Sequence, residues 1–215
     1  MPPRLILLVF ALAVLVAMIQ VNLLVIAFDK LGLSPAAAMS LVLGALFGST
    51  INLPLARVTA EEPAEPPPPL PDWLQRLQIP FEGTTLIAIN AGGCIIPVGF
   101  SMYLMAHSPL PVGEVLPAIA IVSFVSYRLS RPVPRLGIAM PVLVAPFTAA
   151  ITALLINVEY AAPLAYISGT LGVLIGADLL RLGDIRTLGA ARASIGGAGT
   201  FDGIFITGIV AALLT

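Results

Sequence analysis

Long apolar stretches alternate with short polar stretches along almost the whole chain. About 20 apolar residues carry a helix across the hydrocarbon of a bilayer, so this pattern predicts membrane-spanning helices. Seven stretches qualify or nearly qualify, the fourth and seventh being short: 5–28, 36–55, 84–106, 114–129, 136–156, 162–180 and 199–215. We therefore predict an all-α fold, a polytopic bundle of seven transmembrane helices that forms a single membrane domain over residues 1–215.

The composition supports a membrane protein. The chain is 59% hydrophobic and only 10% charged, and its mean hydropathy is +1.05. Soluble domains are about 45–50% apolar and about 25% charged, so an ordinary water-soluble globule is excluded. No small-x-small cleavage site precedes Asp29, which favours a retained first helix over a cleaved signal peptide.

The basic residues predict an orientation. Successive loops between the predicted spans lie on alternate sides of the membrane. Lys30 alone lies in a loop on one side. The other side holds nine arginines and is therefore cytoplasmic by the positive-inside rule: Arg4, Arg57, Arg76, Arg128, Arg131, Arg135, Arg181, Arg186 and Arg192. We expect a cytoplasmic N-terminus, an external C-terminus and a multi-pass location in the cell (inner) membrane. Ten basic and eleven acidic residues exclude a basic nucleic-acid binder. With one cysteine and one histidine, no metal site or cofactor is implied.

Two longer loops lie on the predicted cytoplasmic side. Residues 56–83 form a Pro-rich loop, which we expect to be an extended spacer rather than a partner motif. Residues 71–77 at its end read as a short interfacial helix capped by Asp72. The second loop, 181–198, is basic and ends in glycines. Neither loop is long enough for an independent domain, so the function is expected in or at the bilayer.

Two carboxylates occupy positions inside the predicted membrane region. Asp178 lies late in the sixth predicted span and Asp202 lies early in the seventh. At 1.5 Å per residue, both lie about 5–8 Å below the cytoplasmic boundary. Charged groups inside a bilayer are costly and often mark functional sites. Two structural alternatives remain open: Asp202 could cap the seventh helix, and Asp178 could pair with Arg181, three residues on.

Two amides and a helix break are predicted at a similar depth. Asn52 lies near the inner end of the second span, and Asn90 precedes Gly92 and Gly93 in the third. Such a glycine pair makes a poor continuous helix, and broken backbone at membrane depth is tolerated where it is buried or lines a cavity. We predict these four as binding residues beside Asp178 and Asp202; the alternative is that the amides only hydrogen-bond between helices.

Glycine spacing raises a question about the sixth helix. Gly172 and Gly176 form a small-xxx-small pair, which lets helices approach closely. At 100° per residue, Asp178 points away from this glycine ridge. Either the helix unwinds near Gly176 or the ridge packs on a helix other than the seventh, and the sequence leaves both possibilities open.

Four segments together resemble a known family: 48–55 (GSTINLPL), 90–93 (NAGG) with Pro97, 176–178 (GAD) and 196–205 (GGAGTFDGIF). They are similar to the prokaryotic integral membrane proteins catalogued as domain of unknown function 1614. A weaker likeness is to the intramembrane aspartyl proteases of the presenilin and signal-peptide-peptidase type, which carry one aspartate on helix six and one in a Gly-x-Gly-Asp motif on helix seven. Phe201 stands where the second glycine of that motif would be, no tyrosine precedes Asp178, and two later helices are absent.

Paired carboxylates predict a specific chemistry. Two nearby acids in low dielectric share a proton; the ionised one activates a water while the protonated one polarises a peptide carbonyl. By analogy Asp178 and Asp202 would be catalytic, with a transmembrane peptide as substrate, although which of them is the base stays open. The competing interpretations are a cation- or proton-coupled transporter or channel and a non-catalytic membrane scaffold. The bilayer is the expected surrounding, nucleic acid is not an expected partner, and a homo-oligomer is an open alternative.

Overall fold

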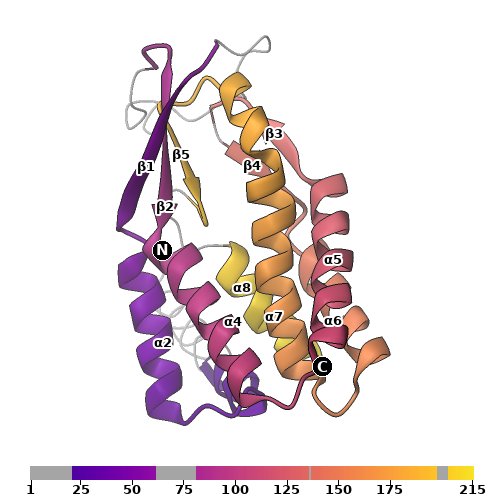
Figure 1. Ribbon diagram of the computed structural model, residues 1–215. Helices are drawn as coiled ribbons and strands as arrows, with labels where there is room; N and C mark the ends of the chain where they lie inside the picture. Colours follow the sequence, from indigo (N-terminus) through magenta and orange to yellow (C-terminus); the bar gives the residue numbers. More distant parts are fainter. Residues whose placement is uncertain (1–20, 62–80, 136, 198–202) are drawn as a thin grey trace, which may run out of the picture.

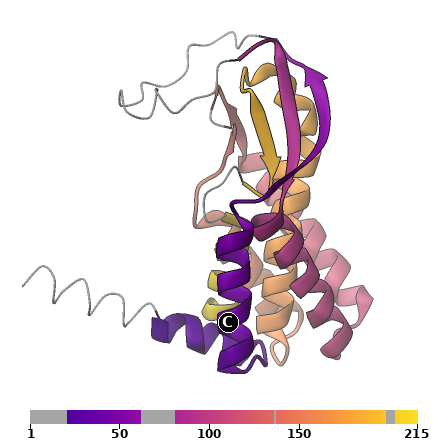
Figure 2. The same ribbon diagram turned by 90° about the vertical axis from the view of Figure 1, so that its left-hand side faces the viewer.

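The computed structural model describes residues 21–61, 81–135, 137–197 and 203–215. Helices pack side by side in one bundle, and a small sheet stands at one end of it (Figures 1 and 2). In chain order the helical elements are Val21–Lys30, α2 (Pro35–Gly48), η1 (Ala91–Ile95), α4 (Ile96–His107), α5 (Val112–Leu129), α6 (Val144–Ile156), α7 (Ala161–Val173), η2 (Leu174–Asp178), η3 (Leu179–Thr187) and α8 (Gly203–Leu214). Of these, η1 and η2 are π-helices and η3 is a 3₁₀-helix.

The strands form two sheets. The larger has the order β1-β2-β5, in which β1 (Asn52–Thr59) pairs antiparallel with β2 (Thr84–Asn90), and β2 pairs parallel with β5 (Arg192–Ile195). The smaller is the hairpin of β3 (Arg131–Val133) and β4 (Gly137–Ala139). Because β2 runs directly into η1 and α4, a single segment passes from the sheet into the bundle.

Local sequence explains the helix α2 and the strand β1. Ser34 caps α2, because its side chain accepts a hydrogen bond from the Ala37 backbone N–H, and Pro35 occupies the first helical position, where its missing N–H is not needed. Pro54 lies in β1, at an edge of the sheet, and the register with β2 shifts between Pro54 and Ala56. An edge strand or a bulge is where a proline is tolerated in a sheet.

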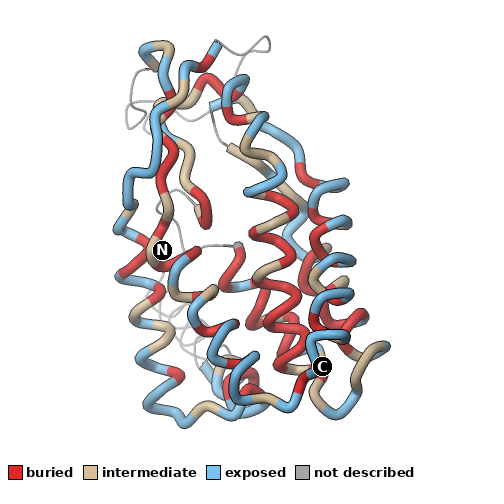
Figure 3. Tube along the Cα trace, viewed as in Figure 1, coloured by how far each residue is buried: buried red, intermediate tan, exposed pale blue. Residues whose placement is uncertain are grey.

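Small side chains dominate the bundle core. Ala118, Ala149, Ala165 and Ala211 are fully buried, which lets the helices approach closely around the buried ring of Tyr166. Several other large apolar side chains face outward: Phe47 is 68% exposed, Phe124 is 64% exposed and Leu155 is 82% exposed. Figure 3 shows buried positions inside the bundle and exposed ones on its outer faces. An apolar outer surface of this kind suits a lipid environment.

Within the described ranges, two helices are long and apolar enough to cross a membrane: α5, and the continuous run Ala161–Thr187, of 27 residues, that joins α7, η2 and η3. A third is possible if Val21–Lys30 and Pro35–Gly48, which are bent by 112°, count as one broken span. The chain is thus mostly helical with apolar helices, as expected for a membrane protein. Seven spans and the orientation of the termini remain predictions.

The all-α prediction is wrong at the sheet. The stretch 84–106 is not one helix, because its first seven residues are strand β2 and only Ala91–His107 is helical. The second predicted span, 36–55, ends as helix at Gly48 and enters β1 at Asn52. The fifth, 136–156, includes β4 before α6 begins at Val144. Hydropathy does not separate an apolar strand from an apolar helix, and that ambiguity explains these errors.

Several predictions fall outside the part of the chain that the structure describes. They include most of the first span, the proline run, the short helix at 71–77 and the residue Asp202. The described arginines all belong to the strands, to η3, to the last turn of α5 or to the turn after β3, at the end of the molecule that holds the sheet (Figure 1). Lys30 instead contacts the Leu213 carbonyl oxygen near the C-terminus, which Figure 1 marks at the other end of the bundle. The arginines and Lys30 are thus separated in the structure as the sequence predicts, on two opposite sides.

Candidate functional site

The junction between sheet and bundle is built around Asn90. This side chain is fully buried at the end of β2, and its amide nitrogen donates to the Ser49 carbonyl oxygen at 2.7 Å and to Asn52 Oδ1 at 3.1 Å. Its Oδ1 accepts from the Gly93 backbone N–H at 2.8 Å, which caps the π-helix η1. Asn52 Oδ1 also accepts from the Ser194 hydroxyl at 2.6 Å. The two predicted amides therefore contact each other and join β1, β2, β5 and η1.

The glycine pair after Asn90 lies at a close backbone contact. A Cβ placed on Gly92 would lie 1.9 Å from the Ala45 carbonyl oxygen and 2.3 Å from the Ser49 backbone nitrogen, both at the end of α2. Gly93 carries the N–H that caps η1. The predicted helix break at the glycine pair is therefore not found: the chain changes from strand to helix before it, and both glycines lie in the helical run Ala91–His107. The missing side chains allow the start of η1 to pack directly on the backbone of α2.

Asp178 lies at the end of η2 and reaches the segment that follows β5. Its Oδ2 accepts a hydrogen bond from the Gly196 backbone N–H at 2.8 Å. Gly196 has φ +82°, and a Cβ there would lie 2.7 Å from the backbone nitrogen of Cys94 in η1. Asp178 is therefore connected through Gly196 to the same junction that Asn90 organises. Ser194 and Gly196 were not among the predicted site residues; the glycine pair that opens the family segment 196–205 is the sequence signal that could have indicated Gly196.

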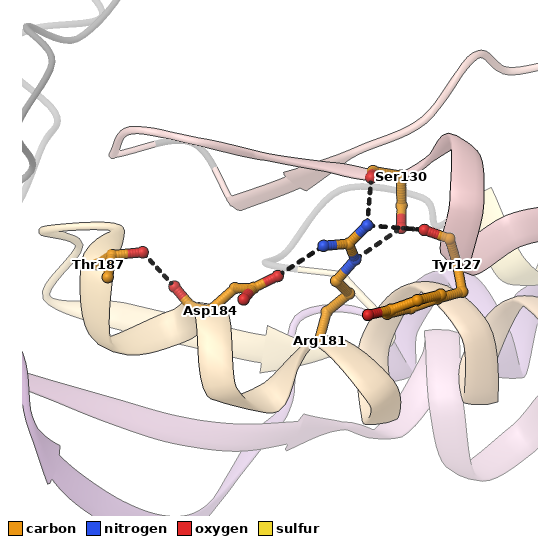
Figure 4. Close-up of polar contacts among 5 residues, drawn as sticks. All are labelled: Tyr127, Ser130, Arg181, Asp184 and Thr187. Atoms are coloured by element: carbon orange, nitrogen blue, oxygen red, sulfur yellow. Dashed lines mark hydrogen bonds and ion pairs between the residues drawn. The ribbon is translucent and has the colours of Figure 1, made fainter.

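Arg181 does not neutralise Asp178. Its guanidinium forms an ion pair with Asp184 at 2.9 Å, donates to the Tyr127 and Ser130 carbonyl oxygens at 2.7 and 2.9 Å, and donates to the Ser130 hydroxyl at 3.2 Å (Figure 4). The guanidinium carbon also lies 4.4 Å from the centre of the Tyr127 ring. Arg181 thereby caps the exposed carbonyls at the end of α5. Asp184, in the predicted cytoplasmic loop, is the acid that pairs with it.

Asp178 lines a small cavity beside β5. The cavity has a volume of 150 Å³, and its other lining residues include Ile138, Leu188, Arg192, Ser194 and Gly197. Because a water takes a share of about 30 Å³ in the liquid, the space holds a few water molecules. Among the described residues, Asp178 is the acidic side chain that borders it.

The structure decides the question about the glycine ridge. The helix changes to π geometry over Leu174–Asp178, so it does unwind near Gly176. The ridge also packs on α5 rather than on α8: a Cβ on Gly172 would lie 2.6 Å from Val122 Cβ, and one on Gly176 would lie 2.2 Å from the Ser123 carbonyl oxygen. Both possibilities left open by the sequence therefore hold.

Asp202 lies outside the described residues, so its position relative to Asp178 is not established. The residues that flank this gap belong to the same region. Gly197 lines the cavity of Asp178. Ile204, in the first turn of α8, belongs to the same buried cluster as Leu174 and Ala177.

Comparison with known proteins identifies the family. The model of the family described as "Protein of unknown function (DUF1614)" matches residues 46–214, which is most of the chain. The chain belongs to this family, as the sequence motifs predicted. No curated protein and no solved structure matches. The fold and the geometry of the site are therefore the basis for any functional proposal.

Proposed function

We propose that this member of the DUF1614 family is an integral membrane hydrolase of the aspartyl type. Asp178 and Asp202 are the proposed catalytic pair, and a transmembrane peptide is the proposed substrate class. The observation that carries the proposal is the state of Asp178: its carboxylate borders a cavity and is not paired with Arg181, whose charge Asp184 balances. The ion pair with Arg181, which the sequence left open as a structural role for Asp178, is thereby removed.

The chain path supports the pairing with Asp202. Asp178 holds the backbone of Gly196, and α8 begins at Gly203 with Ile204 in the cluster that contains Ala177. Asp202 is the residue immediately before α8. One described end of the intervening segment is thus hydrogen-bonded to Asp178, and the other shares a buried cluster with residues of η2, which supports a carboxylate pair in this region.

The chemistry follows from two carboxyl groups in a confined space. The ionised member accepts a proton from a water, which attacks the peptide carbonyl carbon. The protonated member donates a hydrogen bond to the carbonyl oxygen and stabilises the charge that develops on it. Proton transfer to the leaving nitrogen then allows the C–N bond to break. We leave open which aspartate acts as the base.

The amides and glycines have a supporting part in this proposal. All the hydrogen-bonding groups of the Asn90 amide are used within the chain, and Gly92 lies against the backbone of α2. We therefore propose an indirect role in substrate binding for Asn52, Asn90, Gly92 and Gly93. They hold η1 and β5 in place beside the cavity.

The experiment compares matched carboxylate variants in liposomes. The probe is a synthetic single-span peptide of leucine and alanine interrupted by a glycine pair, and cleavage is detected by mass spectrometry. Asp178→Asn and Asp202→Asn should each abolish cleavage. Asp184→Asn, which removes an acid that pairs with Arg181 outside the cavity, should retain it.

A substrate-independent measurement accompanies the assay. A peptide with a central hydroxyethylene group mimics the tetrahedral intermediate, and a hydrolase binds such an analogue more tightly than its substrate. Photocrosslinking of this analogue should require both Asp178 and Asp202. If neither variant changes cleavage or crosslinking, the proposal is wrong. If both variants instead abolish proton or cation flux in the same liposomes without any cleavage, the protein is a transporter.

A further inference from the structure

A second cavity lies at the end of the bundle opposite the sheet. Its volume is 550 Å³, within the usual range for small-ligand sites. Residues at the end of α4 and at the start of α7 line it. The polar and charged residues of the lining include Lys30, Tyr103, His107, Glu159 and Tyr160. This cavity shares no lining residue with the cavity of Asp178, so a ligand bound in it would not depend on the proposed hydrolase activity.

The cavity lies at the level where the helices that qualify as membrane spans begin. The two helices that qualify as spans begin at Val112 and Ala161, and Ala161 is itself part of the lining. Tyrosines at such a level are typical of the interface between hydrocarbon and water. Val158, another lining residue, is 75% exposed, and Leu155 one turn earlier is 82% exposed. The cavity therefore opens beside an apolar outer surface, along which acyl chains can lie.

Two opposite charges border the cavity. Lys30 is exposed, and its ammonium donates to the Leu213 carbonyl oxygen at 3.2 Å, in the last turn of α8. An ammonium has three donors, so two remain for a ligand. Glu159 is also exposed, and it is the neighbour of Tyr160 in the chain. Hydrogen bonding to the Glu159 carboxylate, and then its negative charge, raise the pKa of Tyr160.

An aromatic wall completes the lining. The rings of Tyr103 and His107 stack with centroids 4.1 Å apart, and His107 Nδ1 lies 2.9 Å from the Tyr103 carbonyl oxygen. The ring of Phe100 stacks on Tyr103 as well, with centroids 6.0 Å apart. The cavity thus offers a cation for a phosphate and a carboxylate for an ammonium, beside a rigid stack of aromatic rings.

We infer that this cavity binds the headgroup of a zwitterionic phospholipid, with Lys30 on the phosphate and Glu159 on the ammonium. The balance of charges selects this lipid class: an anionic headgroup without an ammonium would meet Glu159 unpaired, and a soluble solute would make no use of the apolar surface at Val158 and Leu155.

The test measures lipid binding to the purified full chain. Native mass spectrometry in detergent counts bound short-chain phosphatidylethanolamine and phosphatidylglycerol during titration. The wild type should prefer phosphatidylethanolamine by about tenfold, equivalent to about 1.4 kcal/mol. Lys30→Gln should weaken both lipids by a similar factor, whereas Glu159→Gln should remove the preference. Arg57→Gln and Glu61→Gln, which make the same charge changes at the sheet end, should alter neither.

The outcomes separate the proposal from its alternatives. Because Lys30 and Glu159 are exposed, both variants should keep the unfolding temperature of the wild type, which circular dichroism checks. Equal affinity of the wild type for the two lipids would overturn the proposal, as would unchanged binding in Lys30→Gln. Glycerophosphoethanolamine has the same headgroup without acyl chains, and equally tight binding of it would show a site for a soluble solute instead.

Discussion

Replacing Gly92 by alanine is the most direct test of how the sheet joins the bundle. The added Cβ would lie 1.9 Å from the Ala45 carbonyl oxygen and 2.3 Å from the Ser49 backbone nitrogen. Both neighbours are backbone atoms of α2 and its cap, so no side-chain rotation can relieve the contact. Reaching the 3.4 Å of an ordinary contact requires η1 to move away from α2 by about 1.5 Å.

The cost has two parts. Overpacking of a tight contact typically costs about 1–3 kcal/mol. The same displacement breaks the 2.7 Å hydrogen bond from Asn90 to the Ser49 carbonyl oxygen, and a buried donor left without a partner costs about 1–3 kcal/mol more. We therefore expect Gly92→Ala to lower the free energy of unfolding by about 2–6 kcal/mol.

Gly99→Ala is the matched control. Gly99 lies in α4, only seven positions further along the same segment, and nothing lies within 4 Å of a Cβ placed there. Alanine is the better helix former by about 1 kcal/mol, so this variant should be neutral or more stable. Thermal unfolding of both variants in detergent, followed by circular dichroism, measures the difference. If Gly92→Ala unfolds at the temperature of Gly99→Ala, the close contact between η1 and α2 is not real.

Three further substitutions test neighbouring contacts by the same unfolding measurement. Arg181→Lys should cost about 1–3 kcal/mol, because an ammonium cannot reproduce the planar fork that holds the end of α5; full stability would contradict the capping role. Gly176→Ala should destabilise strongly, since its Cβ would lie 2.2 Å from the Ser123 carbonyl oxygen, whereas Gly183→Ala, with nothing within 4 Å, should not. Asn90→Asp should destabilise at neutral pH, because its ionised carboxylate would face two acceptor oxygens, and less at acidic pH, where protonation restores one donor. A loss of stability that does not change with pH would argue against this hydrogen-bond arrangement.

Hydropathy predicted the helical bundle better than it predicted the sheet. Strand β2 is apolar and continues into a helix, so the stretch from Thr84 onward reads as a single span. Its pairing with β1 joins residues separated by the long segment 60–83, and its pairing with β5 joins residues more than 100 positions apart. Such pairings depend on hydrogen bonds between distant segments, which the local period of a sequence does not encode.

The candidate site was partly predictable for a related reason. Depth along predicted spans grouped Asn52 with Asn90, and these two side chains are in contact. The same reasoning offered Arg181 as a partner of Asp178, because three residues along an α-helix bring side chains together. The chain changes from π to 3₁₀ geometry at Asp178, which alters that spacing, and Arg181 pairs with Asp184 instead. The residues of the site could be named from the sequence, but the local helix geometry that decides which of them pair could not be predicted from it.

The polar residues of the junction therefore differ in what they do. Interrupted helices leave backbone N–H groups that a continuous helix would satisfy itself, and Asn90 and Asp178 each accept one of them, from Gly93 and Gly196. Asn90 is fully buried and spends its remaining hydrogen-bonding capacity inside the chain, whereas Asp178 borders a cavity. Asp178→Asn keeps an oxygen that can accept from Gly196, so it should leave the unfolding temperature close to that of the wild type while removing the charge. Stability retained together with activity lost would assign Asp178 to chemistry; a large loss of stability would mean that its charge serves the fold.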